Sequence, residues 1–440
     1  MAFAFTVMAD PVSSVAYAIE AALRALDGDP ASLVATMGLV VGVIVVVAAT
    51  YHQLIGRFPS GGGGPEGVAE AFGEGWAFLP LGALLVDFTL TVAVSCAAGA
   101  AALIAYLPGL AGVRLPIALA LAAAVACGVM LGHRGRVGFA IATQAFLLMA
   151  AVVIVAGAFA DPAPTGAVAE AKHGGTLLAD ASLAAVLMAL PLGMALATGV
   201  EAPSNAIAQL PQLHDRGRRL FGRWTLWLMV MIVGGLTLSF AMLAVHLRIG
   251  LPDGDSTLLA EIARRAVGGG VALATFQALS ALLLLAAAAS SYLAGSGVLK
   301  ALSGLGRDGG DGLLPEPFHR QNRFLVAHWG VILILGLAAA MILAAGGREQ
   351  ELVQFYAVAV FASFLAATLG CVRLSFRDGR LWAMTANLFG AALVTLVLAL
   401  NLTRLDSAIA LLASLAIALY LWRAWVVRGR PGGIVEAGAR

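Results

Sequence analysis

The sequence has little charge. Only 11% of its 440 residues are Asp, Glu, Lys or Arg, whereas 61% are hydrophobic. A soluble domain carries about 25% charged residues, so most of this chain is expected to lie in lipid. The net charge of +2 says little about partners, because the distribution of charge matters more than its sum. No nucleic-acid partner is expected.

Cysteines and catalytic motifs are also scarce. The three cysteines, Cys96, Cys127 and Cys371, lie in separate apolar segments, and their spacing fits neither a metal site nor a disulfide framework. Neither an HExxH motif nor a nucleophile elbow appears. The glycine-rich stretch 60–66 is not followed by the Gly-Lys-Ser/Thr of a Walker loop, and we interpret it as lying along the cytoplasmic surface. We therefore expect a protein that is not an enzyme and has no cofactor.

Twelve stretches are long and apolar enough to cross a bilayer, for which roughly 20 residues are needed. They cover residues 2–26, 33–50, 76–107, 115–132, 137–160, 179–210, 223–247, 269–294, 325–346, 352–373, 381–402 and 407–427. The sequence therefore predicts an all-α polytopic membrane protein with twelve spans. The first span has few residues before its interruption, which favours a natural chain that starts further upstream.

Loop charge orients these spans. With the N-terminus placed in the cytoplasm, the inward loops and the C-terminal tail hold most of the 26 Lys and Arg residues, including four within residues 216–223. Because basic loops favour the cytoplasmic side, both termini are expected in the cytoplasm.

Two spans contain a proline beside an acid in an otherwise apolar stretch. The first reads Ala9-Asp10-Pro11-Val12-Ser13-Ser14, and the sixth reads Gly199-Val200-Glu201-Ala202-Pro203-Ser204-Asn205. Proline removes a backbone donor and clashes with the preceding turn, so both helices should break there. The two breaks recur after five spans, and an odd number of spans per repeat makes the repeats inverted. Paired breaks in inverted repeats indicate a substrate site near the membrane midplane. The alternative is that each proline only kinks its helix.

Four acids lie within the predicted spans: Asp10, Glu20, Asp87 and Glu201. An ionised side chain at the bilayer centre costs roughly 2.5–3.5 kcal/mol, and no Lys or Arg lies deep in any span. The acids should therefore be protonated, hydrated or bound to a cation, all of which indicate a cation or proton pathway. Two alternatives are left open: Asp10 and Glu201 as caps of broken helices, and Glu20 as an acid that faces water.

Span three places oxygen-bearing side chains on one face. Phe88, Thr91 and Ser95 share a stripe at the helical period, and Asp87 borders it. Hydroxyls on a common face can replace part of a cation's hydration shell. They can equally hydrogen-bond their own helix or a neighbour.

Several stretches resemble a known family. Residues 10–18 read Asp-Pro-Val-Ser-Ser-Val-Ala-Tyr-Ala, and further matches cover residues 51–63, 85–95, 198–205, 313–323 and 355–361. In this order, along nearly the whole chain, they resemble the motifs of the amino acid–polyamine–organocation (APC) superfamily. Within it they most resemble the branch of KimA-type potassium–proton symporters. Phe88 stands where a tyrosine is usual in that branch.

The resemblance implies a LeuT-type fold, a five-plus-five inverted repeat with broken helices 1 and 6 and two further helices. The parts would be 1–160 (spans 1–5), 161–374 (spans 6–10) and 375–440 (spans 11 and 12 with a short tail). It also implies a substrate and potassium site at the helix breaks. The residues implied are Asp10, Tyr17, Thr91, Ser95, Thr198, Glu201 and Tyr356, with Asp10, Asp87 and Glu201 as coupling candidates.

These observations favour a secondary carrier that takes up potassium with protons across a bacterial cytoplasmic (inner) membrane. The alternative is an amino-acid or amine permease, which usually has a glycine-rich first break whose N–H groups hold the substrate carboxylate. Here Asp10 and Pro11 supply a negative charge and a missing donor instead. A channel is disfavoured because the TVGYG filter is absent. A non-transporting sensor is left open, and so is the assembly state, for which a homodimer is one option.

Overall fold

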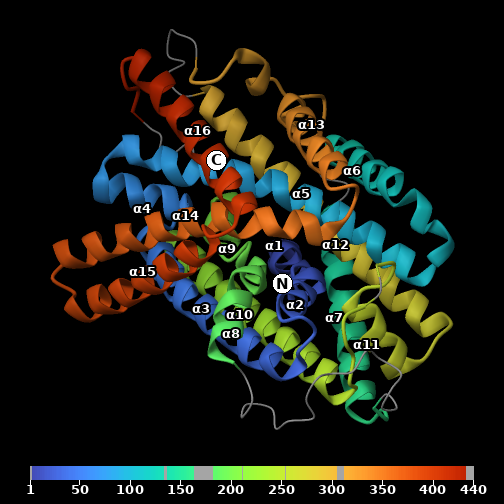
Figure 1. Cartoon of the computed structure of the whole chain (residues 1–440). Helices are drawn as coiled ribbons and strands as arrows, with labels where there is room; N and C mark the ends of the chain where they lie inside the picture. Colours follow the sequence, from blue (N-terminus) through green and yellow to red (C-terminus); the bar gives the residue numbers. More distant parts are fainter. Residues whose placement is uncertain are drawn as a thin grey trace.

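The computed structural model describes residues 2–132, 136–162, 182–210, 212–252, 254–304 and 312–432, without the side chains of residues 2, 3, 136, 137, 139, 209, 356 and 357. Over these residues the regular structure is entirely helical (Figure 1). The α-helices are α1 (Ala2–Ser13), α2 (Val15–Ala25), α3 (Pro30–Arg57), α4 (Gly63–Phe72), α5 (Phe78–Tyr106), α6 (Arg114–Met130), α7 (Arg136–Ala158), α8 (Leu183–Gly193), α9 (Ala202–Ala206), α10 (Asp215–His246), α11 (Leu258–Val267), α12 (Val271–Gly304), α13 (His328–Ala344), α14 (Glu349–Arg377), α15 (Leu381–Asn401) and α16 (Leu405–Val427).

The predicted spans coincide with these helices. Within the described ranges, ten helical stretches are long and apolar enough to cross a membrane, which confirms a multi-pass, all-helical membrane protein. The first predicted span is divided between α1 and α2, each of which is too short to cross alone. The ninth falls on α13, an apolar helix of 17 residues. The count of twelve therefore stays a prediction that depends on these two cases.

The helix that holds the eighth predicted span is longer than that span. The sequence places it at residue 294, whereas α12 continues to Gly304. Serine lowers the hydropathy of this stretch without ending the helix, because its hydroxyl can donate to a carbonyl of the preceding turn. Ser296 donates in this way to Leu293 O (3.2 Å) and Ser303 to Lys300 O (2.7 Å).

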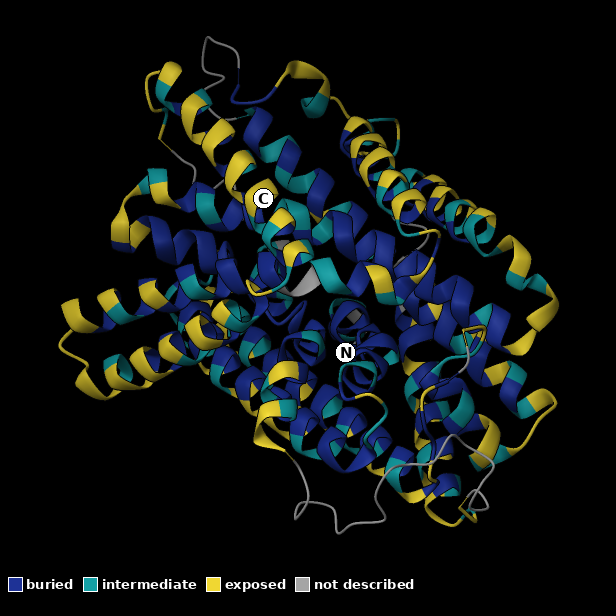
Figure 2. Ribbon diagram, in the orientation of Figure 1, coloured by how far each residue is buried: buried dark blue, intermediate teal, exposed yellow. Residues whose placement is uncertain are grey.

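Helix α5 lies at the centre of the bundle. It packs against α6, α12, α13, α14 and α16, and 89% of its most apolar stretch is buried, against 28% for α6, α15 and α16. Figure 2 shows the exposed residues running along these outer helices, while α1 and α5 are mostly buried. Outward-facing apolar side chains are what a bilayer requires. The residues of α5 are instead enclosed by protein.

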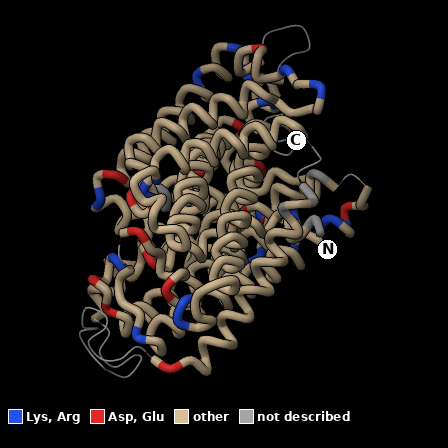
Figure 3. The backbone as a smooth tube through the Cα atoms, turned by 90° about the vertical axis from the view of Figure 1, so that its right-hand side faces the viewer, with Lys and Arg blue, Asp and Glu red and all other residues tan. Residues whose placement is uncertain are grey.

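Charged residues lie mostly at the margins of the molecule (Figure 3). Two short helices in these regions, α4 and α11, are ten residues long each and were predicted as loops. The glycine-rich stretch before α4 was predicted to lie along the surface. It is buried instead: Gly61 packs against Ala208, and Gly63 against Ser204 and Asn205. Only residues without a Cβ allow this close approach.

Candidate functional site

The first predicted break is present, and it is narrow. Helix α1 ends at Ser13 and α2 begins at Val15, with Pro11 in the last turn of α1. Two carbonyls of this turn are satisfied by serines: the Ser13 hydroxyl donates to Asp10 O (2.7 Å), and the Ser14 hydroxyl donates to Pro11 O (2.6 Å). The sequence therefore supplies both the proline that interrupts the helix and the hydroxyls that stabilise the interruption.

The second break is wider. Helix α8 continues as a 3-10 turn over Met194–Ala197, and α9 begins only at Ala202. Thr198 is extended, and Gly199 has a φ of +76°, which favours glycine. The Thr198 hydroxyl donates to Ala195 O (3.0 Å), and the Ser204 hydroxyl donates to Glu201 O (2.6 Å). Residues 198–201 thus form a non-helical segment inside a membrane span.

The two breaks touch each other. A Cβ on Gly199 would lie 2.9 Å from Cγ and Cδ of Pro11 and 3.2 Å from Oδ2 of Asp10. The Ser14 hydroxyl also reaches Leu196 O at 3.3 Å. The predicted pair of broken spans therefore forms one contiguous structure, in which Pro11 and Asp10 lie against Gly199.

Three acids gather at this junction. Asp10, Asp87 and Glu201 are 8%, 2% and 5% exposed. The carboxyls of Asp10 and Glu201 interact electrostatically, and both also act on Asp87. Oδ1 of Asp10, Oδ1 of Asp87 and Oε2 of Glu201 are buried without a hydrogen-bond partner, and no Lys, Arg or His forms an ion pair with these acids, within the described residues. Three buried negative charges cannot coexist unless protons or cations neutralise them.

The hydroxyls predicted on span three lie on the same helix as Asp87. Thr91 and Ser95 of α5 have no exposed surface, and Ser95 Oγ has no hydrogen-bond partner in the described chain. The Phe88 ring, in contrast, packs towards α12 and α13, because a Cβ on Gly295 would lie 3.3 Å from it and 2.6 Å from Ile334. Of the predicted stripe, Thr91 and Ser95 are thus buried about one and two turns along α5 from Asp87, whereas Phe88 fills space between helices.

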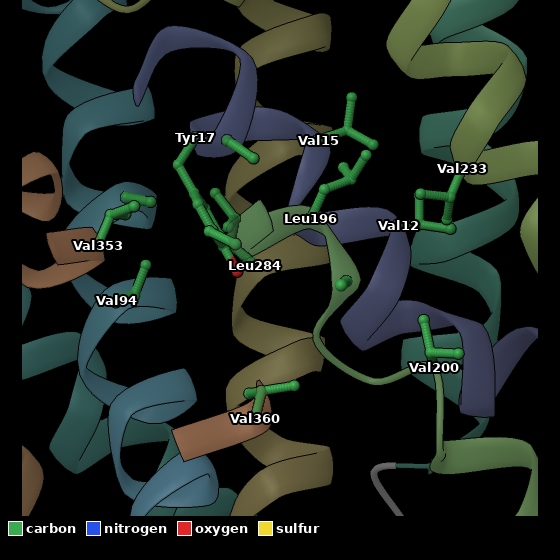
Figure 4. Packing of buried hydrophobic residues seen from close by; sticks show 14 of the residues in the cluster. Val12, Val15, Tyr17, Val94, Leu196, Val200, Val233, Leu284, Val353 and Val360 are labelled. Atoms are coloured by element: carbon green, nitrogen blue, oxygen red, sulfur yellow. The ribbon is translucent and has the colours of Figure 1, made fainter. Parts of the chain in front are cut away.

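Of the two tyrosines predicted as site residues, the structure describes the side chain of Tyr17 but not that of Tyr356. Figure 4 shows Tyr17 of α2 among apolar side chains of neighbouring elements, including Val94, Leu196 and Leu284. It is 1% exposed. Tyr356 lies on α14, but its side chain is outside the described part of the chain.

A third tyrosine, Tyr51 of α3, begins the matched stretch 51–63 but was not predicted as a site residue, and it is 1% exposed. Its ring packs edge-on against Phe364 of α14, with centroids 5.8 Å apart. Its hydroxyl interacts electrostatically with Glu201 and Asp87. A lone tyrosine near the end of an apolar span carries no local signal of such a role, because its neighbours come from distant segments.

A cation at the contact between the two breaks would be coordinated by oxygen atoms from several helices. Among the described residues, no three His, Cys, Asp or Glu side chains converge as ligands of one metal ion. The groups available are carboxylates of Asp10 and Glu201, hydroxyls of Thr91, Ser95 and Thr198, and carbonyls at the breaks. Such a set suits a large, weakly hydrated monovalent cation better than a tightly bound metal, because many neutral oxygens can replace a hydration shell.

Glu20 does not face water, which was one of the alternatives that the sequence left open. The sequence offers no basic residue deep in a span, and Glu20 was considered as an acid that faces water. It is 1% exposed, and its Oε1 accepts from Arg24 Nη2 at 2.8 Å. Its Oε2 accepts from the backbone N–H of Leu258 at 2.9 Å, at the N-terminus of α11. Nearby, Arg114 lies 3.5 Å from the buried Glu349. Glu20 is therefore ion-paired, unlike Asp10, Asp87 and Glu201, which have no basic partner in the described chain.

Removing Arg24 should destabilise the protein. Arg24→Gln leaves the buried Glu20 with one partner, and we expect a loss of about 2 kcal/mol, below the ~3–5 kcal/mol of fully buried pairs because the Arg24 side chain is 36% exposed. The measurement is unfolding of the purified protein in detergent. The control is Glu20→Gln combined with Arg24→Gln, which should recover part of the loss. A single variant as stable as the original chain would show that the pair contributes nothing.

Comparison with known protein families matches residues 1–420 to the amino acid permease family. The chain belongs to this family. The permease is thus a membrane transporter, as its resemblance to the APC superfamily implied. It is 30% identical over 403 residues to the potassium transporter KimA of Bacillus subtilis (strain 168). The alignment covers 89% of the permease and 64% of KimA, so the permease spans less than two thirds of that relative's length.

Proposed function

We propose that the permease is a secondary active carrier that couples uptake of a monovalent cation, potassium, to the movement of protons. Three buried acids, which have no basic partner among the described residues, lie at the contact between two broken helices and carry this proposal. They require neutralisation, and either a proton or a cation can supply it. Exchange of one for the other is the chemical basis of coupled transport.

The proposed site combines these acids with the buried oxygens around them. Its residues are Asp10, Tyr17, Thr91, Ser95, Thr198, Glu201 and Tyr356, with Asp10, Asp87 and Glu201 as the groups that link cation and proton. The similarity to a relative named as a potassium transporter supports the choice of cation.

The proposed architecture is two inverted repeats, 1–160 and 161–374, followed by 375–440. The equivalent breaks of α1–α2 and α8–α9 support it, since paired broken helices in corresponding positions mark inverted repeats. We place both termini in the cytoplasm of a bacterial cell, because the positive loops then face inwards. In this orientation α4 lies on the cytoplasmic side and α11 on the outer side.

A second candidate is a permease for a cationic amino acid or an amine. The family to which the chain belongs favours it. An ammonium group could pair with Glu201 or Asp10, but the substrate carboxylate would meet Asp10 and the missing N–H of Pro11. The first break therefore lacks the donors that amino acid recognition uses.

An uptake screen tests the proposal. The purified full chain is placed in liposomes with an inward proton gradient and offered rubidium-86 as a potassium tracer, radiolabelled amino acids, or radiolabelled amines. We expect rubidium to accumulate, to be displaced by unlabelled potassium, and to stop accumulating when a protonophore collapses the gradient. Accumulation of an amino acid or amine alone would instead establish the second candidate. Flux of none of these would leave a sensor as the better description.

A further inference from the structure

A helix on the cytoplasmic side lies directly against the second break. Helix α4 is too short to span the bilayer, and the glycines at its start contact α9 and the 3-10 turn Ile207–Gln209 that follows it. A Cβ on Gly61 would lie 2.6 Å from Ala208 of this turn, and Gly63 contacts Ser204 and Asn205 of α9. Close packing of this kind couples the position of α9 to that of the segment that begins α4.

The first turn of α4 carries a buried acid, Glu66. It is 9% exposed, and its Oε2 has no hydrogen-bond partner among the described residues. This oxygen is turned back towards the start of the helix, since a Cβ on Gly62 would lie 2.7 Å from it. Burial of an unpartnered carboxyl oxygen is costly unless a proton or a cation accompanies it.

The basic groups around Glu66 are engaged elsewhere. Helix α4 packs against α3, α5, α14 and the 3-10 turn Glu74–Ala77. Arg57 of α3 pairs with Glu70 and with Asp378, and Arg377 of α14 donates to Glu70 O. The remaining charged or titratable groups of these elements are His52 and Tyr51 on α3, Glu74 in the 3-10 turn, Asp87, Cys96 and Tyr106 on α5, and Glu349, Glu351, Tyr356, Cys371 and Arg373 on α14. Arg373 lies over the Phe72 ring, 5.2 Å from its centroid.

These surroundings place the titration of Glu66 near neutrality. Burial, and then the charge of Glu70, raise the pKa of Glu66 from 4.5 to about 7. The carboxyl is therefore mostly protonated below neutral pH and mostly ionised above it. A group that changes charge in this range can exchange protons with the cytoplasm.

Tyr51 connects α4 with the acids at the breaks. A Cβ on Gly64 would lie 3.3 Å from the Tyr51 hydroxyl. The same hydroxyl interacts electrostatically with Glu201 and Asp87. One phenol thus borders both the helix that carries Glu66 and the proposed cation site.

We propose that Glu66 is a second protonation site, on the cytoplasmic side of the helix breaks, which exchanges the transported proton with the cytoplasm. The step is a simple transfer: the carboxyl releases a proton to water and becomes a carboxylate, which then accepts a proton from the side of the breaks. The proposal rests on the proposed proton-coupled function. It adds a residue that the resemblance to the APC superfamily did not imply.

Infrared spectroscopy tests the protonation site without transport. The carboxyl C=O absorption of the purified full chain is followed from about pH 5 to about pH 9, which brackets the titration. We expect a step near neutrality that is smaller in Glu66→Gln, since other buried carboxyls contribute to it, and that the control Glu74→Gln, on the same side of the molecule, retains in full. An identical step in Glu66→Gln overturns the proposal. Folding is checked by thermal unfolding at about pH 8, where loss of a carboxylate whose pKa is raised should not lower stability.

Transport tests its role. In liposomes, Glu66→Gln should lower proton-driven rubidium-86 uptake by about tenfold or more, whereas rubidium exchange at equal pH on both sides should stay close to that of the original chain. Glu74→Gln should behave as the original chain in both assays. Gradient-driven uptake by Glu66→Gln with an unchanged dependence on internal pH overturns the proposal, and so does loss of exchange, which would assign Glu66 a structural role.

The two proposals fail separately. If the original chain takes up no rubidium under a proton gradient, the proposed function is wrong. The infrared comparison then decides whether Glu66 is a protonation site. A smaller step in Glu66→Gln than in the original chain supports the site, and an identical step overturns it.

Discussion

Glu201→Gln is expected to abolish proton-coupled uptake while leaving the protein folded. The side chain is 5% exposed, lies at the start of α9 and has no basic partner in the described chain. Burial favours the protonated form, and a bound cation favours the carboxylate, so one group can hold either. The amide keeps the size but can carry no charge and release no proton. The measurement is rubidium-86 uptake by the purified protein in liposomes, with and without an inward proton gradient.

Thermal stability serves as the control for this variant. Removal of a charge that costs roughly 2.5–3.5 kcal/mol in the membrane should leave the unfolding temperature unchanged or raise it. Glu351→Gln is the matched variant, since Glu351 lies at the exposed start of α14. Normal, gradient-dependent uptake by Glu201→Gln would falsify its coupling role, and Glu201 would then be a structural cap.

Gly199→Ala should also reduce uptake strongly, for a steric reason. Gly199 has a φ of +76°, and an added Cβ would lie 2.9 Å from two ring carbons of Pro11. The strained backbone costs about 1–3 kcal/mol, and crowding costs about 1–3 kcal/mol more. We expect the two breaks to be pushed apart, with a lower unfolding temperature and a reduction of uptake by about tenfold or more, as small misplacements in a site produce.

The matched variant is Gly235→Ala in the middle of α10. Its added Cβ meets no atom within 4 Å, and alanine favours a helix by about 1 kcal/mol over glycine. This variant should transport normally. If Gly199→Ala transports as well as Gly235→Ala, the contact between the breaks does not matter for transport.

The helix breaks could be predicted from the sequence because their causes are local. Pro11 and Pro203 each interrupt an apolar run, and the serines that satisfy the freed carbonyls, such as Ser13, Ser14 and Ser204, are within three residues of their partners. Apolar length likewise located the long helices. That the two breaks touch was a consequence of the inverted-repeat interpretation and not of any one residue.

The surroundings of Tyr51 and Glu66 depend on tertiary contacts that the sequence does not reveal, whereas the Glu20–Arg24 pair follows from helical spacing. Tyr51 packs against Phe364 of α14, and α4, which carries Glu66, packs against the same helix, which lies far along the chain. Glu20 and Arg24, in contrast, are four residues apart on one helix, a spacing that brings side chains together. The pairing could therefore have been inferred from spacing, whereas the contact of Glu20 with Leu258 could not.

Helix α5 is enclosed by five neighbouring helices, so the two sides of the proposed site differ in how easily they can move. A helix packed on all sides cannot tilt without repacking every neighbour, whereas non-helical segments such as residues 198–201 can change their dihedral angles cheaply. If the proposed function is correct, we expect Asp87, Thr91 and Ser95 to keep their positions during transport, and Asp10 and Glu201 to move with the helix breaks. A cation bound between the two groups would then be released when Asp10 and Glu201 move away from α5, on which Thr91 and Ser95 are one turn or about 6 Å apart.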